Sequence, residues 1–308
     1  MARFNTPLRY AIRGGKEGKK RLDLLARVML PTTMQLFDRV GLIRGMKCMD
    51  VGCGGGHVTI SMARVVGPEG RVIGTDTDAE ILALAREDAE AAKVINVTFQ
   101  QVDASSCLWH GKFDLAYARF LLSHLNETEK CLAAMVEACL PGGTVVIEDT
   151  DFAGSFCYPT CAAYERYKQL YQGLVKRRGG DSNIGPKLPA MLRRAGIEGI
   201  ELNVIQPAHI YGEGKLMAPV TMGFRVARSK MVLRNLSCAA GATCTLSHRQ
   251  IAVQKIAMPA RGRDTRVTLT PLERRAINSL SADSRPKTRR IAVNNPHGMV
   301  KISENGST

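Results

Sequence analysis

Apolar and polar positions follow two alternating periods over the first two thirds of the chain. Short apolar runs rich in β-branched residues predict strands, and the stretches between them carry apolar residues three and four positions apart, which predicts helices. Because strands and helices alternate, we predict an α/β fold with a doubly wound, mostly parallel sheet and right-handed crossovers. Strands are expected at 47–51, 71–75, 97–102, 113–118, 144–148 and 199–205, and helices at 57–66, 77–92, 126–140, 162–178 and 186–195.

The two ends of the chain depart from this alternation. Residues 20–43 have a helical pattern, and Pro31 is expected to divide it into two helices because proline lacks a backbone N–H. From about residue 223 the periodicity fades while arginine and serine become frequent. We therefore predict a largely disordered or poorly packed tail at 223–308. Weak strand-like pieces remain in it at 251–256, 266–269 and 290–293.

Short polar signals predict where two of the helices begin and end. Thr77 and Glu80 have the spacing of a capping box, and Asn126 with Glu129 is expected to cap the helix that follows them. The Pro-Gly-Gly run at 141–143 is expected to stop that helix before the next strand.

Composition and charge limit the classes of protein to which this chain can belong. The net charge is +15, and residues 224–308 hold 16 Lys and Arg against 4 Asp and Glu, so most of the positive excess belongs to the tail. No apolar run approaches the ~18 residues of a membrane span, and the basic N-terminus lacks the apolar core of a targeting segment. The nine cysteines have no paired metal-ligand spacing. We expect reduced thiols, a cytoplasmic protein and no metal.

A glycine-rich turn follows the first predicted strand, with Gly52, Gly54 and Gly56 before the helix that starts at His57. Glycine lets a backbone turn sharply and lie against a ligand, and the N-terminus of the next helix favours negative groups. A dinucleotide-binding fingerprint has its third glycine one place later, where this chain has His57. The turn therefore predicts a nucleotide-like ligand with a spacing unlike the dinucleotide pattern.

Carboxylates lie at the ends of the first three predicted strands. Asp76 is placed to accept two ribose hydroxyls, because an ionised carboxylate offers two adjacent acceptor oxygens. Asp103 is placed to accept from an adenine amine. Doubly wound folds bind ligands at the carboxyl ends of their strands, so we predict ligand contacts for both residues; the alternative is that each only caps the next turn. Asp50 is expected either to orient the glycine turn from below or to be purely structural.

Together these segments resemble the class I S-adenosylmethionine (SAM) dependent methyltransferases. The resemblance covers about 8–222 and is nearest to the bacterial small-molecule branch, which includes quinone-biosynthesis methyltransferases. It implies a Rossmann-like methyltransferase fold with an N-terminal helical lid at 1–44 and a SAM-binding domain at 45–222. The acceptor lid would be at about 150–195 within that domain, and the basic tail at 223–308 would follow it. Five segments match the family's motifs in order and spacing: 49–58, 72–78, 97–104, 113–125 and 140–149.

The resemblance also implies roles for individual residues. The glycine turn would contact the methionine part of SAM, Asp76 would hold the ribose and Asp103 would read the adenine. Thr77 would flank the adenine, and the backbone N–H of Ala104 would donate to it. The predicted cofactor-binding residues are Asp50, Gly52, Gly54, Gly56, Asp76, Thr77, Asp103, Ala104 and Arg119.

Candidates for catalysis follow the fourth and fifth predicted strands. Arg119 is placed to contact the cofactor carboxylate or an acidic acceptor, and the alternative is a surface salt bridge. His124 is placed to act as a general base near pH 7, and the alternative is a structural histidine. One of Glu148, Asp149 and Asp151 is expected to hydrogen-bond the acceptor, with Asp151 named as the catalytic candidate. A sulfonium methyl is already activated, so alignment can supply most of the acceleration.

Aromatic side chains gather where an acceptor is expected. Three tyrosines fall on one face of the helix predicted at 162–178. They indicate either core packing or an aromatic wall for a flat or apolar small-molecule acceptor. The residues of this group are Phe152, Phe156, Tyr158, Tyr164, Tyr167 and Tyr171.

Two further expectations concern the two ends of the segment that resembles the family. Tyr10, Arg13 and the glycines at 14–15 are placed to close over the cofactor as a lid. Family members usually finish with an antiparallel strand beside the sixth strand, but here the resemblance stops near Met222. We expect that strand to be missing or replaced by a poor substitute such as 290–293, which would leave sheet edges unpaired.

We predict SAM-dependent methyl transfer to an O, N or C atom of a small molecule, with three alternatives. The basic tail favours a nucleic-acid methyltransferase, but the Asn/Asp-Pro-Pro-aromatic run of base amino methylation is replaced by Ala-Arg-Phe-Leu at 118–121, and the tail lacks interleaved aromatic residues. An NAD-dependent oxidoreductase is the second alternative. The third is a catalytically inactive protein that keeps the fold.

Overall fold

The computed structural model describes residues 15–106, 108–223 and 245–255. The chain divides into two units, Met1–Arg261 and Gly262–Thr308, and every described residue belongs to the first. The helices are α1 (Gly15–Arg39), α2 (His57–Val66), α3 (Ala79–Ala91), α4 (Thr128–Ala138), α5 (Ala162–Arg177), α6 (Leu188–Arg194) and α7 (Met217–Gly223). The strands are β1 (Lys47–Val51), β2 (Arg71–Asp76), β3 (Val97–Gln101), β4 (Phe113–Arg119), β5 (Cys139–Thr150), β6 (Cys157–Tyr158), β7 (Ile200–Ile205), β8 (Ala208–His209), β9 (Thr245–Ser247) and β10 (Gln250–Lys255).

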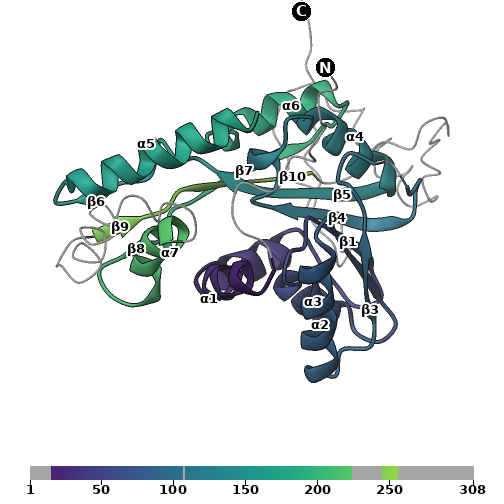
Figure 1. Cartoon of the computed structure of the whole chain (residues 1–308). Helices are drawn as coiled ribbons and strands as arrows, with labels where there is room; N and C mark the ends of the chain where they lie inside the picture. Colours follow the sequence, from purple (N-terminus) through teal and green to yellow (C-terminus); the bar gives the residue numbers. More distant parts are fainter. Residues whose placement is uncertain (1–14, 107, 224–244, 256–308) are drawn as a thin grey trace, which may run out of the picture. The chain divides into compact units, whose positions relative to one another are not determined.

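The main sheet has seven strands in the order β3-β2-β1-β4-β5-β10-β7 (Figure 1). Neighbours among β1 to β5 are parallel, and β10 runs antiparallel to both β5 and β7. The chain order reverses at β1, where β2 lies on one side and β4 on the other. The predicted doubly wound, mostly parallel sheet is confirmed, and its reversal point is where such sheets bind ligands.

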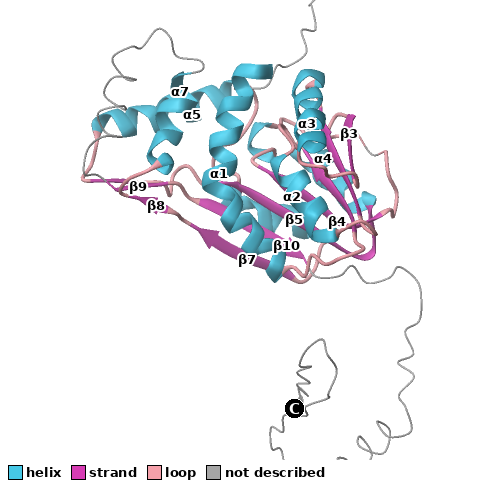
Figure 2. Cartoon of the chain, turned by 90° about the horizontal axis from the view of Figure 1, so that it is seen from below, coloured by secondary structure: helices cyan, strands magenta, loops and turns pink. Residues whose placement is uncertain are grey.

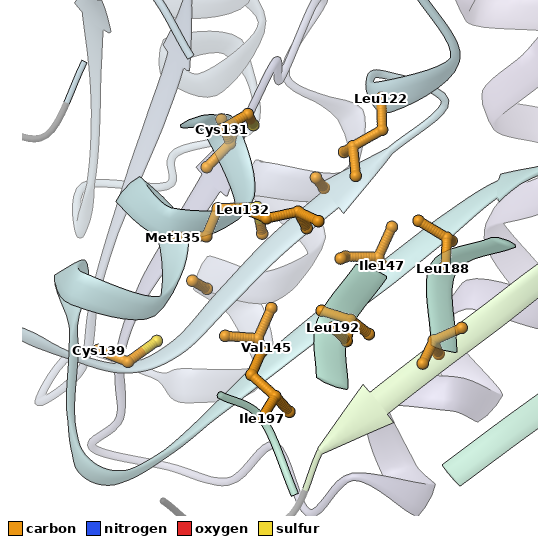
Figure 3. Close-up of a cluster of buried hydrophobic side chains, with 14 of the residues drawn as sticks. Leu122, Cys131, Leu132, Met135, Cys139, Val145, Ile147, Leu188, Leu192 and Ile197 are labelled. Atoms are coloured by element: carbon orange, nitrogen blue, oxygen red, sulfur yellow. The ribbon is translucent and has the colours of Figure 1, made fainter. Parts of the chain in front are cut away.

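Helices cover both faces of the sheet. Helices α1, α2 and α3 lie on the face turned toward the viewer in Figure 2, and α4, α5 and α6 lie on the other side of the sheet in Figure 1. The largest apolar cluster fills the space between α4, α6 and the strands β4, β5 and β10. Figure 3 shows ten labelled members of that cluster: Leu122, Cys131, Leu132, Met135, Cys139, Val145, Ile147, Leu188, Leu192 and Ile197.

Helix α1 is continuous, so the prediction that Pro31 divides it is wrong. The missing N–H of Pro31 costs one intrahelical hydrogen bond. Residues on both sides of the proline are nonetheless anchored in the core, because Met29 and Phe37 are each only 1% exposed. The hydroxyl of Thr32 donates to the carbonyl of Met29 at 2.8 Å and satisfies an acceptor beside the proline. The free energy gained by packing both halves of α1 on the core outweighs the cost of the lost hydrogen bond at Pro31.

Both predicted helix caps are shifted in the structure. Helix α3 is capped by Asp78 and not by Thr77: one Asp78 oxygen accepts the backbone N–H groups of residues 80 and 81 at 3.0 and 3.2 Å. Asn126 does not cap α4, whose N-cap position is held by Glu127 without a side-chain hydrogen bond. Strand β5 starts directly after α4 and includes the Pro-Gly-Gly run, because residues 139–143 stay close to β4 across an irregular register.

Residues 245–255 correct the prediction of a poorly packed tail that lacks the last strand. Strand β10 inserts between β5 and β7, and β9 joins β6 and β8 in a small second sheet. Ile251 and Val253 enter the cluster under α4 and α6, while Ala252 faces the cluster under α1 and α2. Both faces of β10 are thus buried, which drives its insertion. The other strand-like pieces, 266–269 and 290–293, lie outside the described residues.

Candidate functional site

A cavity lies at the carboxyl ends of β1, β2 and β4, and α1 lines it from the opposite side. We call the part of its wall formed by Asp50, residues 52–55, Asp76 and Asp78 the glycine-loop side. We call the part formed by Phe152, Tyr167, Tyr171, Thr221 and residues 248–250 the aromatic side. Arg119 and Phe120, at the end of β4, belong to the same wall.

The glycine turn has the left-handed backbone that its sequence predicts. The φ angles of Gly52, Gly54 and Gly56 are 69°, 51° and 76°, values that side chains other than glycine rarely adopt. A Cβ on Gly56 would lie 2.9 Å from the Cβ of Ala85 and 2.9 Å from the ring of Phe99. Gly56 therefore serves packing below the turn, while Gly52 and Gly54 line the cavity.

Asp76 holds the glycine turn in place from the end of β2. Its two carboxylate oxygens accept the backbone N–H groups of Gly54 and Asp78, each at 3.0 Å. Burial raises the pKa of Asp76, and these hydrogen bonds oppose the rise. Asp76 lines the cavity at the position predicted for a ribose contact.

Asp50 lies beneath the turn at the end of β1. It is buried, and it accepts a hydrogen bond from the hydroxyl of Thr59 in α2 at 2.6 Å. Burial raises the pKa of Asp50 to about 7. Asp50 thus joins β1 to α2 and also lines the cavity; its predicted orientation of the glycine turn stays a prediction.

The residues predicted to surround adenine are not among those that line the cavity. One oxygen of Asp103 accepts the backbone N–H of Ser105 at 2.8 Å and its hydroxyl at 2.5 Å, and these bonds lower the pKa of Asp103. Thr77 is exposed, and Ala104 packs against the apolar cluster under α4. The adenine contacts therefore stay a prediction. Ile81 in α3, which the sequence did not single out, does line the cavity.

Arg119 and Phe120 form a constrained corner at the end of β4. Phe120 has a φ of 52°, a left-handed value that costs a bulky side chain roughly 1–3 kcal/mol. Its backbone N–H donates to the carbonyl of Glu148 at 2.8 Å, which holds the corner. The guanidinium of Arg119 donates to the hydroxyl of Thr33 in α1 at 3.1 Å and lies 5.8 Å from the Phe120 ring centre. Arg119 is thereby fixed in the cavity wall.

A buried carboxylate below this corner was not distinguished by sequence reasoning from its two acidic neighbours. Glu148 is fully buried and accepts hydrogen bonds from the hydroxyls of Thr33 at 2.7 Å and of Tyr117 at 2.5 Å. The amide of Gln250 donates to its other oxygen at 3.4 Å. Glu148 therefore connects α1, β4 and β10 beneath the cavity. Burial and the adjacent Glu148 raise the pKa of Tyr117, so Tyr117 stays a neutral phenol.

His124 does not fit the expected role of a general base near pH 7. Its ring lines the cavity and packs edge-on against Tyr171, with centres 6.5 Å apart. Burial, together with the charges of Arg21 and Arg178, lowers the pKa of His124 to about 3. A histidine with that pKa is neutral at physiological pH and holds a proton poorly, so the alternative of a structural histidine is favoured.

Asp151 lies outside the cavity wall, which argues against its predicted contact with the acceptor. It is 6% exposed, and its carboxylate accepts the backbone N–H of Gly154 at 3.2 Å and pairs with Arg249, whose Nε is 3.2 Å away. Asp149 is buried as well and accepts the backbone N–H of Ser123 at 3.1 Å. Burial raises the pKa of Asp149 to about 6. Both residues hold the backbone around the site.

The predicted aromatic group divides between the cavity and its surroundings. Phe152, Tyr167 and Tyr171 line the cavity, and Tyr164 lies in the adjoining apolar cluster. Phe156 and Tyr158 are exposed. Core packing and an aromatic wall are therefore both present.

Two parts of the wall contain residues that sequence reasoning did not name as site residues. Helix α1, within the segment expected to be a helical lid, contributes Arg21, Leu22, Leu25 and Met29, whose helical spacing is also that of ordinary core residues. Residues 248–250 follow a stretch without periodicity, so no pattern marked them. The lid candidates Tyr10, Arg13 and Gly14 lie outside the described residues, and Gly15 is the first residue of α1.

A sequence model of the methyltransferase domain matches residues 42–196, which is half of the chain. The chain belongs to the methyltransferase domain family. The match starts just before β1 and ends after α6, so it contains the glycine-loop side of the cavity. Membership confirms the predicted family and supports it over an NAD-dependent oxidoreductase.

A curated relative agrees with this membership over the same domain. Over 132 residues the chain is 30% identical to the ubiquinone/menaquinone biosynthesis C-methyltransferase UbiE of Yersinia pestis, which corresponds to 42% of this chain and 52% of that protein. The chain thus spans about half the length of the curated relatives it matches.

Solved methyltransferase structures share the fold. A Bacillus halodurans protein assigned as a methyltransferase has a TM-score of 0.54 at 18% identity, over 74% of this chain and 97% of that one. Phosphoethanolamine N-methyltransferase 2 of Haemonchus contortus, solved with phosphomonomethylethanolamine and S-adenosylhomocysteine, has a TM-score of 0.50 at 19% identity, over 78% of this chain and 52% of that one. The class I methyltransferase fold is confirmed. Within the described ranges, none of the helices is long and apolar enough to cross a membrane.

Proposed function

We propose that this chain is a SAM-dependent methyltransferase that acts on an O, N or C atom of a small-molecule acceptor. One observation carries the proposal: the half-buried carboxylate of Asp76 accepts the N–H of Gly54 at the point where the strand order reverses, in a chain of the methyltransferase family. This arrangement places a backbone segment without side chains next to a hydrogen-bond-accepting carboxylate on one wall of the cavity.

The glycine-loop side suits the donor. A Cβ on Gly52 would lie 2.7 Å from a methyl of Leu121, and a Cβ on Gly54 would lie 3.1 Å from Leu22, so larger residues would close the space against which a ligand lies. Asp50, Asp76 and Asp78 make this side acidic, which favours a cationic sulfonium and an ammonium group. Bound there, SAM would supply a methyl group already activated for in-line displacement.

The protein's own part is alignment and exclusion of water. Helix α1 lies over the sheet (Figure 2) and lines the cavity, where it would limit the access of water to bound reactants. The Arg119–Phe120 corner, held by Thr33 and Glu148, lines the same cavity and would orient the reactants there. Positioning of this kind can supply several kcal/mol of the barrier reduction. Because its lowered pKa makes His124 a weak base, the proposal assigns no general base.

A small acceptor fits the site better than a nucleic acid. The aromatic side is enclosed by α1, α5 and α7, which leaves room for a small ring system. The Yersinia pestis relative is a C-methyltransferase of ubiquinone/menaquinone biosynthesis, which also supports a small-molecule acceptor. We further propose that the enzyme works in the cytoplasm, because the six cysteines in the described part of the chain are free thiols.

Isothermal titration with S-adenosylhomocysteine and with NADH tests the proposal. Wild-type protein should bind S-adenosylhomocysteine, and Asp76→Ala should weaken that affinity about tenfold or more, because hydrogen bonds to a charged group contribute roughly 1.5–3 kcal/mol. Asp38→Ala, which removes an exposed carboxylate on α1, is the control and should leave the affinity unchanged. Binding of NADH alone, or equal affinities for the two variants, would refute the proposal.

A further inference from the structure

We propose that the aromatic side of the cavity selects acceptors that combine an aromatic ring with an anionic group, such as an aromatic carboxylate, and that Arg249 binds the anion. The proposal rests on the proposed function only in taking the glycine-loop side as the donor site. It names the acceptor class that the remaining wall of the cavity would bind.

Arg249 is held in the wall by one short segment, residues 151–155. Its backbone N–H donates to the hydroxyl of Ser155 at 3.1 Å, and its carbonyl accepts the N–H of Asp151 at 3.1 Å. Its Nε lies 3.2 Å from the carboxylate of Asp151. A guanidinium has five N–H donors. The charge of Asp151 thus holds the guanidinium at the wall without a hydrogen bond to Nε, and the Nη1 and Nη2 donors are available to an anion in the cavity.

A glycine makes room for this arginine. A Cβ on Gly154 would lie 2.4 Å from Cδ and 2.9 Å from Nη1 of Arg249. Any other residue at position 154 would push the guanidinium out of its place. The backbone contacts, the ion pair and this close approach show that the guanidinium position is specified by the fold and is not that of a flexible surface side chain.

Charge is distributed unevenly around the cavity. The carboxylates that line it, Asp50, Asp76 and Asp78, are all on the glycine-loop side. Arg21 from α1 lies near the aromatic side, since its charge acts on both His124 and Tyr167. With Arg249, the aromatic side carries two guanidinium groups. An anionic acceptor would thus face a cationic methyl donor across the cavity.

Three aromatic rings line this side of the cavity. The rings of Phe152 and Tyr171 stack on each other with centres 4.3 Å apart and planes inclined by 10°. Tyr167 lies 5.7 Å from Phe152 at a tilt of 56°. Aromatic rings favour offset-stacked or edge-to-face contact with a further ring. Phe152 directly follows Asp151, so the stacked pair and the arginine are positioned by the same segment.

Much of this side lies beyond the family match. The match ends at residue 196, whereas Met217, Thr221 and residues 248–250 all line the cavity. The donor side therefore comes from the shared domain, and the acceptor side includes residues that belong to this chain's own continuation. A shared donor side and a chain-specific acceptor side are expected when enzymes of one fold act on different acceptors.

Two probes that differ in charge alone test the proposal: 4-hydroxycinnamate and its neutral amide. Each is titrated by calorimetry into full-length protein saturated with S-adenosylhomocysteine. We expect the carboxylate to bind at least tenfold more tightly than the amide. The variant Arg249→Gln should remove this difference, and Arg249→Lys should retain part of it. Arg193→Gln, an exposed arginine on α6, should keep the full difference.

Removal of Arg249 alone leaves the carboxylate of Asp151 buried without its cation. The double variant Asp151→Asn/Arg249→Gln is therefore measured as well. It too should bind the two probes with equal affinity. Equal affinity of wild type for both probes, or no binding of 4-hydroxycinnamate to protein that holds S-adenosylhomocysteine, overturns the proposal. A carboxylate preference that is retained by both Arg249→Gln and the double variant also overturns it. Protein that does not bind S-adenosylhomocysteine contradicts the donor site instead, which separates the two failures.

Discussion

Gly41 and Gly56 have nearly the same left-handed backbone but different surroundings. Their φ angles are 74° and 76°. A Cβ on Gly41 would meet nothing within 4 Å, whereas one on Gly56 would lie 2.9 Å from both Ala85 and Phe99. The pair therefore separates the cost of the backbone conformation from the cost of crowding below the ligand turn.

We predict that Gly41→Ala lowers the free energy of unfolding by about 1 kcal/mol, from backbone strain alone. Gly56→Ala should lower it by a further ~1–3 kcal/mol, because the added methyl overpacks the interface of α2 and α3. Urea unfolding monitored by circular dichroism measures both. Equal losses would show that the turn has room for a side chain and would contradict the described packing.

Asp50 makes stability depend on pH in a direction opposite to that of a salt-bridged carboxylate. Its pKa rises from 3.8 to about 7 on folding because burial disfavours the charged form. Below pH 3.8 the group is protonated in both states and contributes nothing. As pH rises toward 7 the unfolded state ionises first, so this group lowers stability progressively, and the loss is complete above about pH 7.

Asp50→Asn should therefore stabilise the protein at pH 8 and have little effect at pH 4. One unit of pKa shift corresponds to about 1.4 kcal/mol, so the gain at pH 8 should amount to a few kcal/mol. The amide oxygen can still accept from Thr59, which keeps the contact with α2. Thermal melts of both proteins across this pH range measure the difference. A gain that is the same at pH 4 and pH 8 would rule out ionisation as its cause.

Single residues were predictable where a local motif marks them. Asp76 follows a strand and a glycine turn, so its place in the cavity could be read from spacing. Arg249 has no such motif, because its position depends on contacts with residues almost 100 positions earlier. The pKa of His124 was also out of reach, since burial and the charge of Arg21 from α1 set it.

At the scale of elements, β10 decides whether the sheet is complete. It pairs with β5 over residues 250–254 and with β7 over residues 250–255. Its apolar residues alternate between two clusters, with Ile251 and Val253 on one face and Ala252 on the other. Without β10, two neighbouring strands would expose unpaired edges.

Ile251→Ala should lower the free energy of unfolding by about 2–5 kcal/mol, the usual cost of truncating a fully buried side chain. Ile251 is 2% exposed, and the control Leu202→Ala on β7 truncates a side chain that is 51% exposed. The control should change stability by about 0.5 kcal/mol or less. Urea unfolding curves measure the free energy of unfolding of both variants. Similar small losses in both would mean that β10 is not part of the folded sheet.

The elements from β1 to β7 were predictable, except the two-residue strand β6, because period and length agree in each of the others. The short elements β8, β9 and α7 were not predicted, and two longer elements differ from the prediction. Helix α1 continues through Pro31 because both halves pack on the core, and packing is invisible in a local pattern. The weak strand-like piece expected at 251–256 is confirmed as β10, but its pairing with residues 45 to 108 positions earlier gave no local signal.

At the scale of the whole molecule, the described cavity is assembled from residues far apart in the chain. Leu22 and Gln250 both line it, and Glu148 accepts hydrogen bonds from Thr33 and Gln250 beneath it. The family match contains the glycine-loop side of the cavity, and α1 and residues 248–250 complete its wall. A ligand that fills the cavity should therefore contact the beginning, the middle and the end of the described chain.

A crystal structure of the protein with S-adenosylhomocysteine tests the central claim most directly. The account predicts that the two ribose hydroxyls lie within hydrogen-bond distance of the Asp76 carboxylate and that the amino-acid part lies against Gly52 and Gly54. The sulfur should face the aromatic side, toward Tyr171. A ligand bound elsewhere, or one whose ribose does not contact Asp76, would contradict the account.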